Sequence, residues 1–223
     1  TASDRERRSD LRMPVIIPAA GKDPVFPEGP KSLIPVAGRP ILDHQLESIR
    51  KAGLKNVVIV RGHEAGQFNT YLDDENLFLC DNPSYDETYV LHSLMQAAER
   101  MDQGFAMVFS DILFDHEILS RLIKTGRDIV LGIDNSYVYH KHNIDKKLNM
   151  VVSRKSFDTQ FRSLRQEPVT ELMRLGKNIE PGRADFEFIG IAYFSEEGAR
   201  AFREIYGNCI HSIEGRFHEA VSF

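Results

Sequence analysis

Cysteine is scarce in this sequence of 223 residues, which contains only Cys80 and Cys209. The distance between them along the chain matches neither the CxxC spacing of a redox pair nor the spacing of zinc ligands. The pattern indicates two reduced thiols in a cytoplasmic protein.

Long hydrophobic runs are also missing. No stretch approaches the roughly 20 apolar residues that cross a bilayer, and the opening residues TASDRERRSD are polar where a signal peptide would be apolar. Positive charge is in deficit, with 28 Lys and Arg against 33 Asp and Glu and a net charge of -5. The sequence therefore predicts no membrane and no nucleic-acid partner, while local basic clusters remain suited to a small anionic ligand.

What is present is the composition of an ordinary globular protein, with 42% hydrophobic and 27% charged residues. Residues 1–12 carry seven charged side chains without apolar periodicity, which predicts a disordered leader or linker. The fold is expected to begin near Met13 and to form a single domain over 13–223.

Strand and helix patterns alternate through the first half of the chain. Apolar runs predict strands, and helical spacing of apolar residues predicts helices, with Gly53 ending the first of them. Strands are expected at 15–17, 56–60, 76–80, 105–109 and 128–133, and helices at 41–51, 89–101 and 112–124. Such alternation predicts an α/β fold with a mostly parallel sheet flanked by helices, and a ligand site where the strands end.

The pattern changes after Asp134. A polar stretch is followed by expected strands at 150–152 and 186–194 and an amphipathic helix at 196–206. We interpret residues 135–195 as a mixed-sheet extension or lid on the acceptor side of the site.

The loop after the first strand is the most informative segment. Pro18, Ala19, Ala20 and Gly21 are small or compact residues whose main chain can approach an anion closely, and Lys22 and Lys31 can supply positive charge. An ordinary turn with solvated lysines would explain the tripeptide AAG alone.

The longer string, AAG followed by PKSLIPVAGRPILDHQLESIRKAG, resembles the signature of the nucleotidyltransferases that activate sugar phosphates, choline phosphate and phosphonates. The resemblance implies a Rossmann-like, GT-A-like core, a glycine loop around the nucleoside triphosphate, Lys31 as the catalytic lysine and Mg²⁺ as cofactor. The sequence departs from that signature between Gly21 and Pro30, where KDPVFPEG replaces a longer, arginine-containing run. Lys22 is the candidate substitute for the arginine, as a point charge in place of a bidentate group.

Ser110-Asp111 follows the strand FAMVF, at the position of the family's metal-binding aspartate. The resemblance therefore implies that Asp111 binds Mg²⁺ and that Ser110 borders the nucleotide. A helix N-cap is the alternative role for Asp111. The family's second metal carboxylate has no counterpart before Phe223, so the domain is expected to lack its C-terminal end.

The segment NPSYDETYVLHSL resembles the branch that acts on choline phosphate and phosphonates, and ADFEFIGIAYFSEEGA resembles the cytidylyltransferase domain associated with phosphoenolpyruvate mutase. This resemblance implies that Asn82, Thr88 and Ser93 line the nucleotide pocket. Lys146, Lys147 and Glu187 are candidates for binding the acceptor. The family's paired asparagines are replaced here by Tyr89-Val90.

The resemblance implies a Mg²⁺-dependent cytidylyltransferase that transfers CMP from CTP to a small phosphonate, such as 2-aminoethylphosphonate or 2-hydroxyethylphosphonate, and releases pyrophosphate. Choline phosphate or a sugar 1-phosphate is the alternative acceptor, and four tyrosines are candidates for a choline-binding cage: Tyr85, Tyr89, Tyr137 and Tyr139. An inactive, nucleotide-sensing domain is an alternative of another class. The partner candidates are a second copy of the chain and a fused enzyme domain of phosphonate biosynthesis.

Overall fold

The computed structural model describes residues 13–139, 148–154 and 169–210, and it divides into two compact units. The first unit runs to Leu131 and resumes at Gly190, whereas residues 132–189 belong to the second. Two strands, β7 (Ile129–Asp134) and β10 (Phe186–Phe194), pass from one unit into the other. The expected extension at 135–195 overlaps the second unit.

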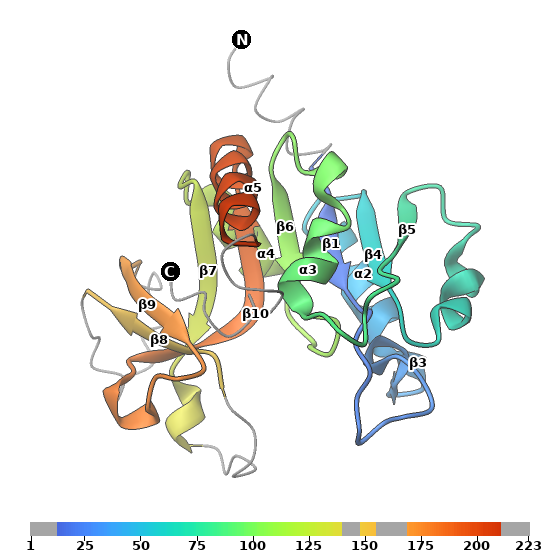
Figure 1. The fold of residues 1–223 in the computed structure, drawn as a ribbon, viewed down its shortest axis with the longest axis horizontal. Helices are drawn as coiled ribbons and strands as arrows, with labels where there is room; N and C mark the ends of the chain where they lie inside the picture. Colours follow the sequence, from blue (N-terminus) through green and yellow to red (C-terminus); the bar gives the residue numbers. More distant parts are fainter. Residues whose placement is uncertain (1–12, 140–147, 155–168, 211–223) are drawn as a thin grey trace. The chain divides into compact units, whose positions relative to one another are not determined.

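The first unit is built on a sheet with the strand order β5-β4-β1-β6-β10 (Figure 1). Four of these strands are parallel, and β10 pairs with β6 in the antiparallel direction. The bounds are Val15–Pro18 for β1, Val57–Arg61 for β4, Leu77–Asp81 for β5 and Phe105–Val108 for β6. Every residue of β1 and β6 is buried, as in a parallel sheet covered on both faces. The predicted mixed, mostly parallel sheet is confirmed.

The described part of the first unit includes four α-helices. They are α2 (Ile41–Lys51), α3 (Val90–Met95), α4 (His116–Lys124) and α5 (Glu196–Ile210). Figure 1 shows α3 in front of β1 and β4 and α2 behind them. His92 of α3 and Tyr206 of α5 are joined by a 3.0 Å hydrogen bond, so these two helices lie against each other.

Short elements connect the main ones. The 3₁₀ turns of the first unit are η1 (Lys31–Leu33), η2 (Ala65–Tyr71) and η3 (Ala98–Arg100), and a two-stranded ribbon is formed by β2 (Pro35–Val36) and β3 (Arg39–Pro40). The second unit contains η4 (Ser136–Tyr139), β8 (Met150–Ser153), β9 (Leu172–Gly176) and η5 (Pro181–Arg183).

Two expected helices are shorter than their patterns predicted. The helix expected at 89–101 ends at Met95 and is followed by the separate turn η3. The helix expected at 112–124 begins only at His116, because the carboxylate of Asp115 accepts the Glu117 N–H at 2.8 Å and caps the helix there. By contrast, α2 ends where Gly53 adopts a left-handed conformation with φ 88°, as expected.

The second unit has a small core of its own. Tyr137, Leu148, Met150 and Ile179 are buried together, with Val152 and Ala184 packed against them. The hydroxyl of Tyr137 lies 3.1 Å from the carbonyl oxygen of Ala184, and burial raises the pKa of this phenol. Tyr137 is therefore a core residue of this unit, which removes it from the candidate aromatic cage.

Gly190 supports the strand that leads to the candidate site. Its carbonyl accepts the Phe109 N–H at 2.8 Å, its φ is +84°, and a Cβ added there would lie 2.5 Å from Cδ2 of Phe109. We expect Gly190→Ala to lower the free energy of unfolding by about 2–3 kcal/mol through backbone strain and overlap. Urea unfolding checks this, with Gly207→Ala as the control, because a Cβ at Gly207 meets nothing within 4 Å. Equal midpoints for the two variants would contradict the prediction.

Candidate active site

The loop after β1 lies beside the end of β4. The N–H of Ala19 donates to the carbonyl of Val60 at 2.7 Å, and the N–H of His63 donates to the carbonyl of Ala20 at 2.9 Å. Pro18, Ala19 and Ala20 are buried, and the chain becomes exposed at Gly21 and Lys22. Because the Ala19 N–H is used by the neighbouring strand, any contact of the main chain with an anion falls to Ala20 and the residues after it.

The stretch from Lys22 to Pro30 is fastened to η2 and to the turn before it. The ring nitrogen Nε2 of His63 lies 3.0 Å from the carbonyl oxygen of Pro27, and the amide of Gln67 donates to the carbonyl of Glu28 at 3.0 Å. His63 is buried. The position of His63 directly after a strand fits either a residue that borders the pocket or a plain turn, and nothing in the sequence pairs His63 or Gln67 with the loop.

Lys31 bridges two carboxylates at this edge of the sheet. Its Nζ lies 2.8 Å from Oδ2 of Asp111, 80 residues away along the chain, and 3.2 Å from Oδ2 of Asp23. Burial lowers the pKa of Lys31, but the hydrogen bond and charge of Asp111, followed by those of Asp23, outweigh it and leave the pKa raised. The ammonium is therefore positively charged at neutral pH. The structure thus brings together Lys31 and Asp111, and it adds Asp23.

Asp23 is fixed at both oxygens. Oδ1 accepts the Val25 N–H at 2.7 Å, while Oδ2 contacts Lys31. The hydrogen bond from Val25 holds the pKa of Asp23 below its usual value against the opposing effect of burial, and the hydrogen bond and charge of Lys31 lower it further. The sequence offered no signal for Asp23 beyond its position in the altered loop.

Asp111 lies in a turn that two side chains of α2 hold by hydrogen bonds. The side-chain amide of Gln45 donates to the carbonyls of Phe109 and Ile112, both at 2.8 Å, and the hydroxyl of Ser48 donates to the carbonyl of Phe114 at 2.9 Å. Gln45 is buried. The alternative that Asp111 caps the next helix is wrong, because Asp115 does so, and Asp111 keeps its exposed carboxylate on Lys31.

Replacing Gln45 by leucine tests this support. The change leaves two carbonyls without their buried donor, and we expect it to lower the free energy of unfolding by about 2–3 kcal/mol. Thermal or urea unfolding measures the loss. Gln67→Leu serves as the control, since it removes one hydrogen bond at an exposed position. A loss no larger than that of the control would show that Gln45 does not hold the turn.

Asn82, Thr88 and Ser93 form one polar network. The amide of Asn82 donates to the hydroxyls of Thr88 at 3.1 Å and Ser93 at 3.0 Å, and its carbonyl oxygen accepts the Ser84 N–H at 3.1 Å. Asn82 and Ser93 are buried. The structure therefore brings these three predicted residues together, with their polar groups directed at one another.

A hollow of about 330 Å³ lies beside this network at the ends of β4 and β5. Arg61 and Asp81 form an ion pair at 2.6 Å on one wall, and Tyr85 packs against Gly62 on another. A Cβ at Gly62 would lie 2.5 Å from Cβ of Tyr85, so only glycine allows this approach. The hollow adjoins the loop through His63, whose ring centroid lies 6.1 Å from that of Tyr85.

The predicted acceptor residues all belong to the second unit of the chain, outside the unit that carries Lys31 and Asp111. Lys146 and Lys147 lie outside the described residues. Glu187 is half-buried on the part of β10 that belongs to the second unit, where it pairs in register with Met150. Ser110 is half-buried beside Asp111 in the turn.

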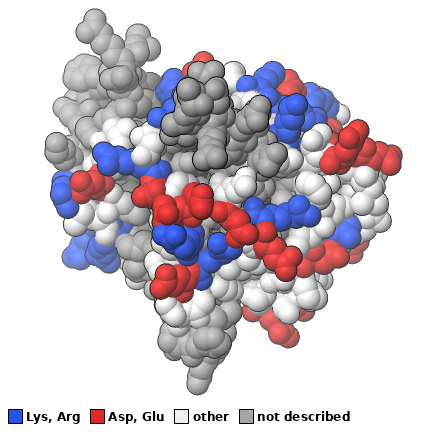
Figure 2. Space-filling view, turned by 90° about the horizontal axis from the view of Figure 1, so that it is seen from above, with Lys and Arg blue, Asp and Glu red and all other residues white. Residues whose placement is uncertain are grey.

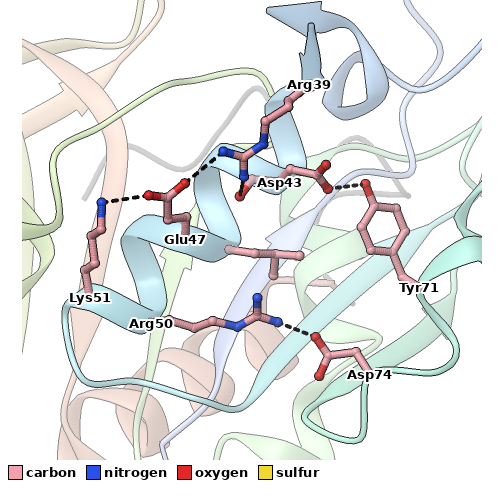
Figure 3. A pocket seen from close by; sticks show the side chains of 8 residues that line it. Arg39, Asp43, Glu47, Arg50, Lys51, Tyr71 and Asp74 are labelled. Carbon is pink, nitrogen blue, oxygen red and sulfur yellow. Dashed lines mark hydrogen bonds and ion pairs between the residues drawn. The ribbon is translucent and has the colours of Figure 1, made fainter. Parts of the chain in front are cut away.

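A larger hollow of about 530 Å³ lies along the outer side of α2 (Figure 3). Its charged side chains face one another in pairs: Arg39 with Glu47, Lys51 with Glu47, and Arg50 with Asp74. The hydroxyl of Tyr71 donates to Asp43 at 2.7 Å. Because the cations and anions here neutralise one another, we assign this hollow to the structural support of α2.

The ion pairs of Glu47 give this region a pH dependence. Hydrogen bonds from Lys51 and Arg39 lower the pKa of Glu47 from 4.5 to about 2. A lowered folded-state pKa stabilises the fold above the unfolded pKa, and that contribution fades as the pH falls. We expect urea midpoints of the parent and Glu47→Gln proteins to differ near neutral pH and to converge between about pH 4.5 and pH 2. A difference that stays constant over this range would contradict the assignment.

Acidic and basic side chains are intermixed on the face shown in Figure 2. The described side chains there form a surface of mixed charge, in keeping with the slight negative balance of the whole sequence. None of the helices in the described part of the chain is long and apolar enough to cross a membrane.

Comparison with known proteins identifies the family. Residues 15–175, which include the loop, Lys31 and Asp111, match the model of the MobA-like NTP transferase domain. The chain belongs to this family. The predicted membership in the nucleotidyltransferase superfamily is therefore confirmed. Lys31, Asp111 and the loop after β1 all lie within the matched part of this MobA-like NTP transferase domain.

Two curated relatives of this MobA-like NTP transferase domain are named for cytidylyl chemistry. One is the CTP:phosphoglutamine cytidylyltransferase of Campylobacter jejuni, 25% identical over 138 residues, which cover 56% of this chain and 54% of the relative. Another is the CMP-5'-(3-aminopropyl)phosphonate synthase of Streptomyces rubellomurinus, 35% identical over 97 residues, which cover 42% of this chain and 15% of the relative. The chain thus matches about half or less of the length of these relatives.

Solved structures show the same fold. The CTP:phosphocholine cytidylyltransferase of Streptococcus pneumoniae matches with a TM-score of 0.57 and 16% identity, over 94% of this chain and 82% of that one. The inositol-1-phosphate CTP transferase of T. maritima matches with a TM-score of 0.65 and 14% identity, over 95% and 78%. The predicted nucleotidyltransferase core is confirmed at the level of the fold.

Proposed function

We propose that this MobA-like domain transfers CMP from CTP to a small phosphonate and releases pyrophosphate. The observation that carries the proposal is the 2.8 Å pair between Lys31 and Asp111, which places a charged ammonium and a carboxylate together where the strands of the sheet end. The names of the relatives support CTP as the nucleotide, and the Streptomyces relative supports a phosphonate as the acceptor.

In the proposed reaction, an oxygen of the acceptor's phosphonate attacks the α-phosphorus of CTP. The bond from this phosphorus to the bridging oxygen of the β-phosphate breaks, and pyrophosphate leaves with the electron pair. Lys31 would offset the charge that develops on the phosphate oxygens, Lys22 would add a second positive charge, and the main chain from Ala20 would position the triphosphate. Positioning and charge compensation are the main contributions of proteins to such transfers.

The residues present fit a magnesium ion that enters with the nucleotide. The carboxylates of Asp111 and Asp23 both contact Nζ of Lys31 and therefore lie close together. Mg²⁺ binds one or two protein carboxylates together with phosphate oxygens and water. The described residues contain no group of three or more metal-binding side chains. Bound there, the ion would polarise the phosphate oxygens and neutralise the leaving pyrophosphate.

A coupled pyrophosphate assay tests the proposal. The protein is mixed with each of the four nucleoside triphosphates, Mg²⁺ and one acceptor from 2-aminoethylphosphonate, 2-hydroxyethylphosphonate, choline phosphate and glucose 1-phosphate. We expect release with CTP and a phosphonate. Release only with choline phosphate or glucose 1-phosphate would transfer the assignment to that acceptor. Tight binding of CTP without release under any condition would identify a nucleotide-sensing domain instead.

A further inference from the structure

The loop that replaces the family's arginine-containing run introduces a carboxylate beside the catalytic lysine. Asp23 and Asp111 both contact Nζ of Lys31, at 3.2 Å and 2.8 Å. These three ionised groups carry one net negative charge, and counting Lys22 brings the sum only to zero. A triphosphate entering here, without a cation, would meet no net positive charge.

Lys31 also has limited capacity for a new partner. An ammonium group has three N–H donors, and Asp23 and Asp111 each accept one of them. The lysine side chain is 35% exposed and Asp23 is 22% exposed, so water screens these charges only in part. An incoming phosphate oxygen must therefore take the remaining donor or displace a carboxylate.

We propose that Asp23 is a positioning residue that holds the Lys31 ammonium against Asp111 and makes nucleotide binding depend on a divalent cation. This inference rests on the proposed function. A divalent cation held by these carboxylates would supply positive charge at the site and take up part of their negative charge, and Lys31 would then be available for the phosphates. Without the cation, the carboxylate of Asp23 competes with the phosphates for the same lysine.

Asp23→Asn tests this role with little structural change. Asparagine keeps an oxygen for the Val25 N–H, which closes the turn, and loses the negative charge that faces Lys31. Glu28→Gln is the matched control, because it removes one charge from the same loop, and Glu28 contacts Gln67 through its backbone carbonyl. Asp23→Glu restores the charge.

Affinity for CTP is measured by isothermal titration in EDTA and again in Mg²⁺. For the parent protein we expect binding at least about tenfold weaker in EDTA. Asp23→Asn should tighten binding in EDTA by about fivefold and so reduce the dependence on Mg²⁺, whereas Glu28→Gln and Asp23→Glu should keep the parent ratio. An unchanged ratio in Asp23→Asn, or an equal change in Glu28→Gln, overturns the proposal.

Inorganic pyrophosphate is titrated in the same way, because it carries no base and tests the charge of the site independently of CTP. If pyrophosphate binding shows the Asp23 effect but CTP does not bind, the proposed cytidylyl transfer fails and the role of Asp23 stands. If CTP binds and pyrophosphate is released, but Asp23→Asn changes neither the affinity for CTP nor that for pyrophosphate, only the role of Asp23 fails. Absence of binding by both probes overturns both proposals.

Discussion

Replacing Lys31 by alanine is expected to lower kcat/KM for cytidylyl transfer by about a hundred- to a thousandfold. The ammonium is the charged group that the fold holds beside Asp111, and its loss leaves two carboxylates at the proposed triphosphate site. Stability should change little, because half-exposed ion pairs contribute at most about 1 kcal/mol. Steady-state pyrophosphate release and urea unfolding separate the two effects.

Lys51→Ala is the matched control for this prediction. Lys51 also forms a short ion pair, at 2.7 Å to Glu47, but in the hollow of Figure 3. Its removal should leave kcat/KM unchanged. Lys31→Arg should recover only part of the activity, since a planar guanidinium does not reproduce a point charge. An alanine variant within threefold of the parent would exclude Lys31 from catalysis.

Replacing Asp111 by asparagine is expected to lower kcat by about a thousandfold in saturating Mg²⁺. The side chain keeps its size and loses the charge that would bind the cation. The turn should survive because Gln45 and Ser48 hold it, and Lys31 retains Asp23 as a partner. Binding of CTP in EDTA should not weaken, because removing a negative charge favours an anion, whereas the gain in affinity on adding Mg²⁺ should largely disappear.

Asp115→Asn is the control four residues further along the chain. Its carboxylate caps α4 through the Glu117 N–H, and asparagine caps helices about as well as aspartate. Activity and stability should both be retained. Equal activity loss in the two variants would indicate damage to the turn in place of a specific role for Asp111.

The sheet could be predicted from the sequence because each of its central strands is a short, continuous run of apolar residues. Runs such as Val15–Ile17 and Phe105–Val108 are apolar throughout, as buried parallel strands require. The helix boundaries were harder to predict. The start of α4 depends on one capping side chain, Asp115, in a segment with several polar candidates. Lys31 and Asp111 could be named from a family signature. Their direct contact across 80 residues of chain could not be predicted from the sequence alone.

Other parts of the candidate site depend on contacts without a sequence pattern. Gln45 sits among apolar residues of α2, and only the fold reveals that its amide holds the turn of Asp111. Asp23 acquires its role because the loop folds back onto Lys31. Asn82 illustrates the converse, since a residue expected to face a ligand directs its amide toward Thr88 and Ser93.

The division of the chain has a consequence for how such a domain can diversify. Residues 132–189 form a compact unit that the chain enters within β7 and leaves within β10. The strands β1, β4, β5 and β6 all precede this unit, so changes of length or sequence inside it leave their register untouched. Substitutions or changes of length in this segment therefore leave the order of the strands that carry Lys31 and Asp111 unchanged, and the segment can be exchanged at two junctions, one in β7 and one in β10.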